Sequence, residues 1–172
     1  MSKTALKKEL QKLTKEKLIE HILELYEKNS SIKEFYKFNL NPGNERALAN
    51  KYKKLIRKEF NVENPMMGTQ KFSVAKKAIS DFKKLQPSPE SLADVMLYLP
   101  ESACELTALY GDYSGPFYNA AYNNYRAALV FMKENDLLDD FEVRSEQCVK
   151  WSKDCGYDFA DDMRDAFDEF YN

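Results

Sequence analysis

The sequence has few of the residues that interrupt helices. Its 172 residues include only 5 glycines and 6 prolines, against 11 phenylalanines and 11 tyrosines. This composition argues against a disordered chain and against a turn-rich all-β fold, and it favours long helices. A chain of this length can bury roughly 70% of its unfolded surface, so it needs no disulfide or metal to fold.

Long apolar runs are absent as well. No segment has 18 consecutive apolar residues, and the N-terminal stretch MSKTALKKELQKLTKEK has charged side chains at every helical turn. We therefore expect no signal peptide, no membrane-spanning segment and a cytoplasmic protein.

Residues that commonly build catalytic or metal sites are scarce. The three cysteines, Cys104, Cys148 and Cys155, include no C-x-x-C pair, which argues against a disulfide framework and against a zinc site. His21 is the only histidine. No nucleophile or acid is signalled beside it, so we interpret it as a residue at the edge of the core. Because the sequence also lacks a phosphate-binding loop, we predict no catalytic residue, no metal site, no cofactor and no enzymatic activity.

Apolar residues recur at helical spacing along almost the whole chain, without sustained alternation of period two. The pattern predicts an all-α fold of about eight or nine helices in stacked antiparallel hairpins, either α-solenoid-like or an irregular bundle. Thr14, Ser73 and Ser88 are the expected N-caps, and Pro100 is expected to kink or split the helix that follows Ser88.

The segment NVENPMMGTQK, residues 61–71, contains Pro and Gly and has no helical period. We expect it to be a connecting loop. It would join an N-terminal basic helical unit, residues 1–60, to a C-terminal helical unit, residues 72–172, with an acidic end.

Charge is divided unevenly along the chain. Residues 1–86 have net charge +10 and residues 87–172 have net charge −12. We expect the two halves to interact, within one molecule or between copies. The acidic C-terminal helix has an apolar stripe of Phe159, Met163 and Phe167, and we expect it to dock beside KFSVAKKAISDFKK or KYKKLIRKEF.

The stretch GDYSGPFYNAAYNNYRAALVFMK, residues 111–133, is rich in tyrosine. On a helix its aromatic residues fall on a broad apolar face, which favours packing against neighbours on two sides. The alternative is a binding groove near the GDYSGP turn, lined by Tyr113, Tyr118 and Tyr122, where rings and asparagine amides could hold a peptide or small ligand.

Lysine-rich faces such as ALKKELQKLTKEK could contact phosphates, although glutamates are interleaved with them. No known DNA- or RNA-binding signature is present, so ordinary solvated faces are favoured over a nucleic-acid site. The acidic segment DFADDMRDAFDEF likewise lacks the loop of a calcium site and is typical of a solvated helix face.

Four segments resemble a known family in the same order along the chain: MSKTALKKELQKLTKEKLIE, KFSVAKKAISDFKKL, SPESLADVMLYLPESA and ALYGDYSGPFYNAAYNNYRAAL. The family consists of uncharacterised bacterial proteins, classed as a domain of unknown function. The resemblance implies a bacterial cytoplasmic protein and carries no activity or site residues. The sequence therefore favours a non-enzymatic helical scaffold or protein–protein interaction module, with a protein partner or self-association. The alternative is a nucleic-acid-binding module that uses the basic half and is inhibited by the acidic C-terminal helix.

Overall fold

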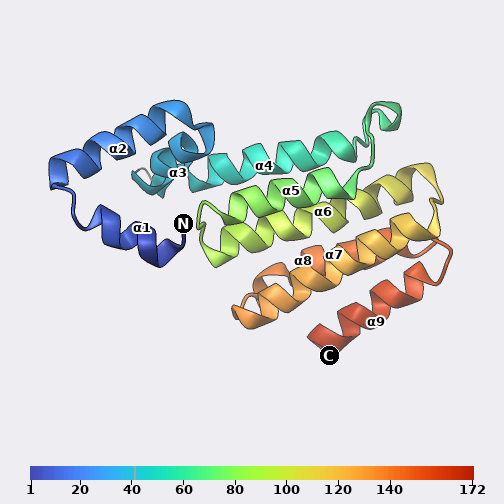
Figure 1. Ribbon diagram of the computed structural model, residues 1–172. Coiled ribbons are helices and arrows are strands. Elements are labelled where there is room, and N and C mark those ends of the chain that lie inside the picture. Colours follow the sequence, from blue (N-terminus) through green and yellow to red (C-terminus); the bar gives the residue numbers. More distant parts are fainter. Residues whose placement is uncertain (41) are drawn as a thin grey trace. The chain divides into compact units, whose positions relative to one another are not determined.

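The computed structural model describes residues 1–40 and 42–172 (Figure 1). It is 79% helical, with nine α-helices and no strand among the described residues, which confirms the predicted all-α fold. The chain divides into two compact units, which we call the N-terminal unit, Met1–Asn44, and the C-terminal unit, Glu45–Asn172. No helix in the described ranges is both long enough and apolar enough to cross a membrane.

The N-terminal unit contains three α-helices and a short 3₁₀ turn: α1 (Lys3–Leu10), α2 (Lys15–Lys28), α3 (Ser30–Leu40) and η1 (Pro42–Asn44). As predicted, Thr14 caps α2, because its hydroxyl accepts the backbone N–H of Lys17 at 3.3 Å. Helices α2 and α3 pack together, with the rings of Tyr26 and Tyr36 6.5 Å apart.

The C-terminal unit contains six α-helices and one 3₁₀ turn: α4 (Glu45–Glu59), η2 (Pro65–Met67), α5 (Phe72–Lys83), α6 (Pro89–Tyr110), α7 (Gly115–Glu134), α8 (Leu138–Ser152) and α9 (Phe159–Tyr171). Consecutive helices form three hairpins, α4 with α5, α6 with α7, and α8 with α9. The hairpins stack, because α4 also packs on α6, α6 on α8, and α7 on α9 (Figure 1).

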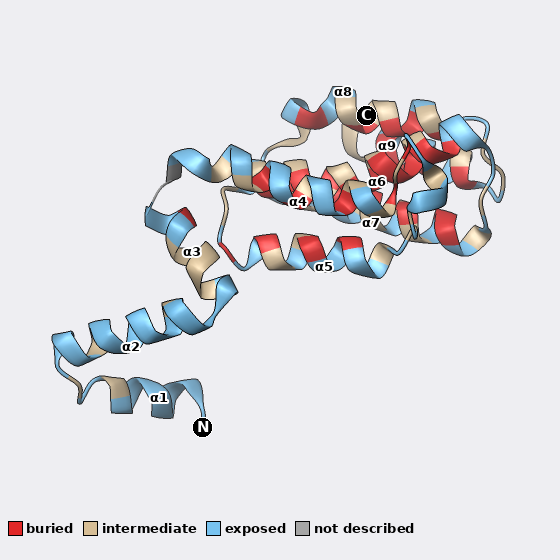
Figure 2. Cartoon of the chain, turned by 90° about the horizontal axis from the view of Figure 1, so that it is seen from above, coloured by how far each residue is buried: buried red, intermediate tan, exposed pale blue. Residues whose placement is uncertain are grey.

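The core of the C-terminal unit lies between these hairpins, where the buried residues of α4 to α9 gather (Figure 2). A row of aromatic rings crosses it. Phe60, directly after α4, lies 4.8 Å from Phe72 and 6.1 Å from Phe117 between ring centroids, and Tyr118 stacks on Phe159 at 4.6 Å. Each hairpin thus contributes rings that contact the next hairpin.

One predicted cap was wrong and one predicted helix break does not occur; the kink expected as the alternative at Pro100 stays a prediction. Ser73 does not cap α5, which begins at Phe72 with Lys71 before it; the Glu59 carboxylate accepts the Lys71 N–H at 3.2 Å instead. Pro100 does not split α6, which is one helix of 22 residues with Pro100 buried inside it. Ser88 does cap α6, accepting the N–H of Ser91 at 3.2 Å.

The compact units divide between Asn44 and Glu45, not at residues 61–71. The physical reason is that α4 buries Ala49, Tyr52 and Ile56 in a helix that packs on α5 and α6. Residues 61–71 therefore join the two helices of one hairpin. This loop folds back on the end of α4, where the Glu59 carbonyl accepts the N–H of Gln70 at 3.0 Å.

Ion pairs link the basic helix α4 to the acidic helix α6. Lys53 lies 2.6 Å from Asp94, and Arg57 lies 2.5 Å from Glu105. Arg144 of α8 binds the same Asp94 and also Glu101, each at 2.6 Å. The two halves of the sequence therefore make charged contacts within one chain.

The predicted docking position of the acidic C-terminal helix was wrong. Helix α9 packs on α7 and α8 rather than beside α4 or α5. It does bury Phe159, Met163 and Phe167, as predicted. A turn of six residues joins α9 to α8, and α7 offers a broad apolar face, so the nearest apolar surface determines the position rather than the distant lysines.

Candidate functional site

The predicted tyrosine groove begins at a turn that is held by Tyr118. Its hydroxyl donates to the Asp112 carboxylate at 2.6 Å and accepts the backbone N–H of Tyr113 at 2.9 Å. Only 2% of Tyr118 is exposed, and burial together with the Asp112 hydrogen bond raises the pKa of its phenol. Tyr118 therefore contributes to the packing of α7 on α9. This is the packing interpretation of the tyrosine stretch, as opposed to a ligand groove.

Asp112 also joins this turn to the one between α8 and α9. Its Oδ1 accepts the backbone N–H of Gly156 at 3.0 Å, in addition to the Tyr118 hydroxyl. These two hydrogen bonds lower the pKa of Asp112. The carboxylate thus links two turns that lie more than 40 positions apart in the sequence.

The other two tyrosines of the predicted groove lie on different elements, Tyr113 in the turn before α7 and Tyr122 within α7. Tyr113 is half-buried and stacks on Phe117, with centroids 4.5 Å apart. Tyr122 is half-buried on the next turn of α7 after Tyr118. The structure therefore brings Tyr113 and Tyr118 together at the turn, and a ligand role for Tyr113 or Tyr122 stays a prediction.

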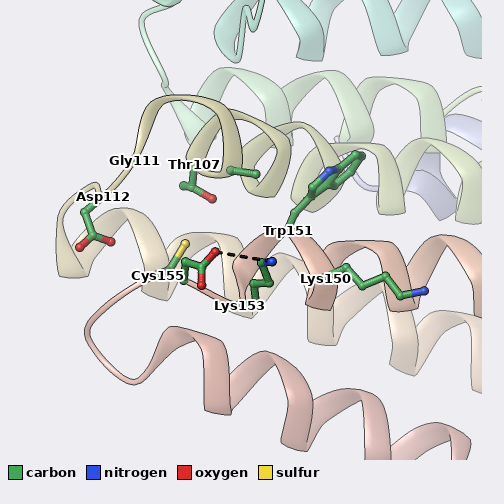
Figure 3. Close-up of a pocket in the computed structure, with 9 residues that line it drawn as sticks. Thr107, Gly111, Asp112, Lys150, Trp151, Lys153 and Cys155 are labelled. Carbon is green, nitrogen blue, oxygen red and sulfur yellow. Dashed lines mark ion pairs between the residues drawn. The ribbon is translucent and has the colours of Figure 1, made fainter.

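A pocket of about 350 Å³ lies beside the Asp112 turn, where the C-terminal ends of α6 and α8 meet (Figure 3). Trp151, the only tryptophan, and Lys153 line one side, Asp112 the other, and Lys150 points away from Asp112. Lys150 bonds Glu146 at 2.7 Å, and Lys153 lies 3.8 Å from Asp154. The sequence did not predict this pocket, because its walls come from two distant helix ends.

The residues considered for catalysis have different surroundings. His21 is exposed on α2 rather than at the edge of a core, because α2 buries none of its residues. Cys104 and Cys148 are buried in α6 and α8, and burial raises the pKa of the Cys148 thiol; Cys155 is half-buried. Within the described ranges, no three His, Cys, Asp or Glu side chains are grouped so that they could hold a metal ion.

The helices of the N-terminal unit bury almost none of their apolar side chains. Among its described residues only Phe38 is buried, and α1 and α2 bury nothing (Figure 2). We call its exposed large aliphatic residues the N-terminal apolar face: Leu6, Ile19, Ile22, Leu23, Leu25 and Leu40.

Two hollows lie on this unit. The first, about 480 Å³, lies between α1 and α2, with leucines 6, 10 and 18 as its apolar lining and Lys3, Lys7 and Gln11 beside them. The second, about 420 Å³, lies between α2 and α3 and is lined by Ile22, Leu23, Tyr26, Tyr36, Lys37 and Leu40. Hollows of this size accommodate the apolar side chains of an added helix.

Comparison with known proteins identifies a family. A model described as a family of unknown function (DUF6155) matches residues 1–170, nearly the whole chain, which confirms the resemblance found in the sequence. No curated protein and no solved structure matches the chain.

Proposed function

Because the chain belongs to the family of unknown function (DUF6155), and membership assigns no activity, we propose a function from its surfaces. The protein is a non-enzymatic helical scaffold of the cytoplasm that binds protein through the N-terminal apolar face. The observation that carries this proposal is an N-terminal unit with one buried side chain among its described residues and six exposed large aliphatic ones.

The energetic argument concerns the area that a partner would cover. The exposures of the six residues range from 40% to 74% and together equal about three whole side chains. Full burial of that surface would contribute roughly 5–9 kcal/mol, from which the loss of freedom on binding is subtracted. A partner that covers the face with an equal apolar area of its own doubles this contribution, so a net affinity in the micromolar range is attainable.

The C-terminal unit supplies the rigid part of such a scaffold. Ion pairs join its helices α4, α6 and α8 through Lys53, Asp94, Arg144 and Glu101. The Arg144 guanidinium binds Glu101 through two nitrogens, Nε at 2.7 Å and Nη2 at 2.6 Å. Paired planar groups of this kind hold helices in register. In the proposed function, the C-terminal unit is thus the rigid part of the chain and the N-terminal apolar face is the part that binds.

The second candidate is a nucleic-acid-binding module that uses the basic half. Its support is a row of exposed lysines on and beside α5: Lys71, Lys76, Lys77, Lys83 and Lys84. Two of them, Lys77 and Lys84, bond Asp81. An inhibitory role for α9 has no support, since α9 packs on α7 and α8. Salt-sensitive binding of DNA or RNA by the intact chain at low ionic strength would favour this candidate.

The test of the interaction function is photo-crosslinking in the cells that make the protein. A photoreactive phenylalanine derivative is introduced at Leu23 of α2, or at Val143 of α8 as the matched control, because both residues are exposed aliphatic residues on helices. We expect a discrete protein adduct from position 23 and none from position 143. The proposal fails if position 23 yields no adduct, or if both positions yield the same adducts.

A further inference from the structure

We propose that the occupant of the N-terminal apolar face is the same face of a second copy of this chain. The inference rests on the proposed function and names its partner. It is carried by two charged borders of the face, one on α1 and one on α2, that have opposite sign.

The border on α1 is basic. Lys3 and Lys7 line the hollow between α1 and α2, next to Leu6 and Leu10. They lie one helical turn apart, so both ammonium groups are on the same side of the leucines. Both lysines are exposed.

The border on α2 is acidic. At 100° per residue, Glu16, Glu27 and Glu20 follow Leu23 within about 60° of helix circumference. Two of these glutamates, Glu20 and Glu27, lie in the stretch Ile19–Glu27, which contains no lysine or arginine. An apolar strip of Ile19 and Leu23 thus has carboxylates along one side.

These borders complement each other when two copies meet. The Ile19 and Leu23 strip of one copy lies on the leucine-lined hollow of the other, which brings its glutamates to Lys3 and Lys7 of that copy. A two-fold axis makes the same contact twice, because every copy has both borders. The exposed apolar area, about three side chains from each copy, then comes to on the order of 1,000 Å² in total, the threshold for a specific interface.

Contacts within the N-terminal unit of one copy leave the apolar face uncovered. In the monomer, the hollow beside α1 reaches only Leu18 of α2, and Ile19, Ile22 and Leu23 stay exposed. Helix α1 has eight residues and buries none of them, and an isolated helix of that length is unstable in water. Cover from a second copy stabilises α1 and α2 together.

The first measurement is sedimentation velocity of the intact chain across a concentration series. We expect a monomer–dimer equilibrium in the micromolar range, weakened at least tenfold by Leu23→Asp. Val143→Asp on α8 is the matched control and leaves the equilibrium unchanged. Far-UV circular dichroism checks that both variants keep the helical content of the parent.

The second measurement exchanges the charges. One variant carries Lys3→Glu and Lys7→Glu, and the other carries Glu20→Lys and Glu27→Lys. Each alone is expected to be monomeric, since its two borders have the same sign. A mixture of the two is expected to form a heterodimer, because both contacts then regain opposite charges.

Four outcomes would overturn the inference. They are a monomer at every concentration, a dimer that Leu23→Asp leaves intact, no heterodimer in the mixture, and an adduct from position 23 that contains a different protein. The last outcome leaves the proposed interaction function standing. The absence of any adduct removes both, so the two failures are distinguishable.

Discussion

The ion pairs of Arg144 allow a quantitative test of how the hairpins are held together. Arg144 lies on α8 and binds Asp94 and Glu101 of α6, whose side chains are 25% and 13% exposed. We predict that Arg144→Gln lowers the free energy of unfolding of the C-terminal unit by about 2 kcal/mol at pH 7. This lies between the 3–5 kcal/mol lost when a fully buried pair is broken and the 0–1 kcal/mol of an exposed pair, because about a third of Arg144 is exposed.

The pH dependence of this loss follows from Glu101. Burial raises the pKa of Glu101 above its ordinary value of 4.5, whereas Arg144 opposes that rise. Removing Arg144 raises the pKa further, so the native variant binds the proton of Glu101 more tightly than the unfolded chain does. The native state is then favoured below the ordinary pKa, and this advantage is lost as pH rises through the raised pKa. The deficit of the variant is therefore expected to be largest at pH 7 and to shrink as pH falls toward 4.5.

The assay is urea unfolding at several pH values, followed by the fluorescence of Trp151, which lies on α8 of the same unit. Lys77→Gln is the control: it breaks an exposed pair with Asp81 on α5 and is expected to change stability by less than about 0.5 kcal/mol. An Arg144→Gln loss no larger than that of the control, or one that does not depend on pH, would refute the reasoning.

Three further predictions concern single side chains of the C-terminal unit. Tyr118→Phe removes the hydroxyl that bonds Asp112, so we expect a loss of about 1–2 kcal/mol in urea unfolding, whereas Tyr157→Phe, at an exposed ring, should change little. Gly68→Ala places a Cβ 2.5 Å from a backbone oxygen, so a lowered melting temperature and a loss of about 1–3 kcal/mol are expected. Met163→Ala leaves a cavity under α9 and should cost about 2–5 kcal/mol by calorimetry; a neutral result would mean that α9 does not need its apolar stripe.

Local patterns in the sequence were sufficient to predict the helices. Thr14 and Ser88 act as caps because the capping contact spans only three residues, and helical periodicity depends on neighbours within two turns. The predicted Ser73 cap was wrong because the contact at the start of α5 is not local. The side chain that accepts a backbone N–H at the start of α5 is Glu59, which lies 12 positions before Lys71 and reaches it only after the hairpin has closed.

Contacts between distant residues could not be predicted in the same way. The sequence placed a unit boundary at residues 61–71, since Pro and Gly interrupt the periodicity there, but periodicity does not reveal which helix packs on α4. The pocket beside Trp151 and the link from Asp112 to Gly156 form where the C-terminal ends of α6 and α8 meet, and these ends, Tyr110 and Ser152, lie 42 positions apart in the sequence. The broad face of α7 was predicted from its tyrosines, and its partner α9 was not.

The row of aromatic rings has a consequence for how the molecule opens. Because Phe60, Phe117 and Phe159 belong to successive hairpins and are joined through ring contacts, loosening one hairpin removes packing from the next. Stacked helical repeats fray from their ends only where such neighbour coupling is weak. The C-terminal unit is therefore expected to behave as one cooperative foldon, with its slowest amides exchanging only by global unfolding. The amides of α1 and α2, with no buried residues beneath them, exchange on a separate and much faster timescale unless a partner holds them.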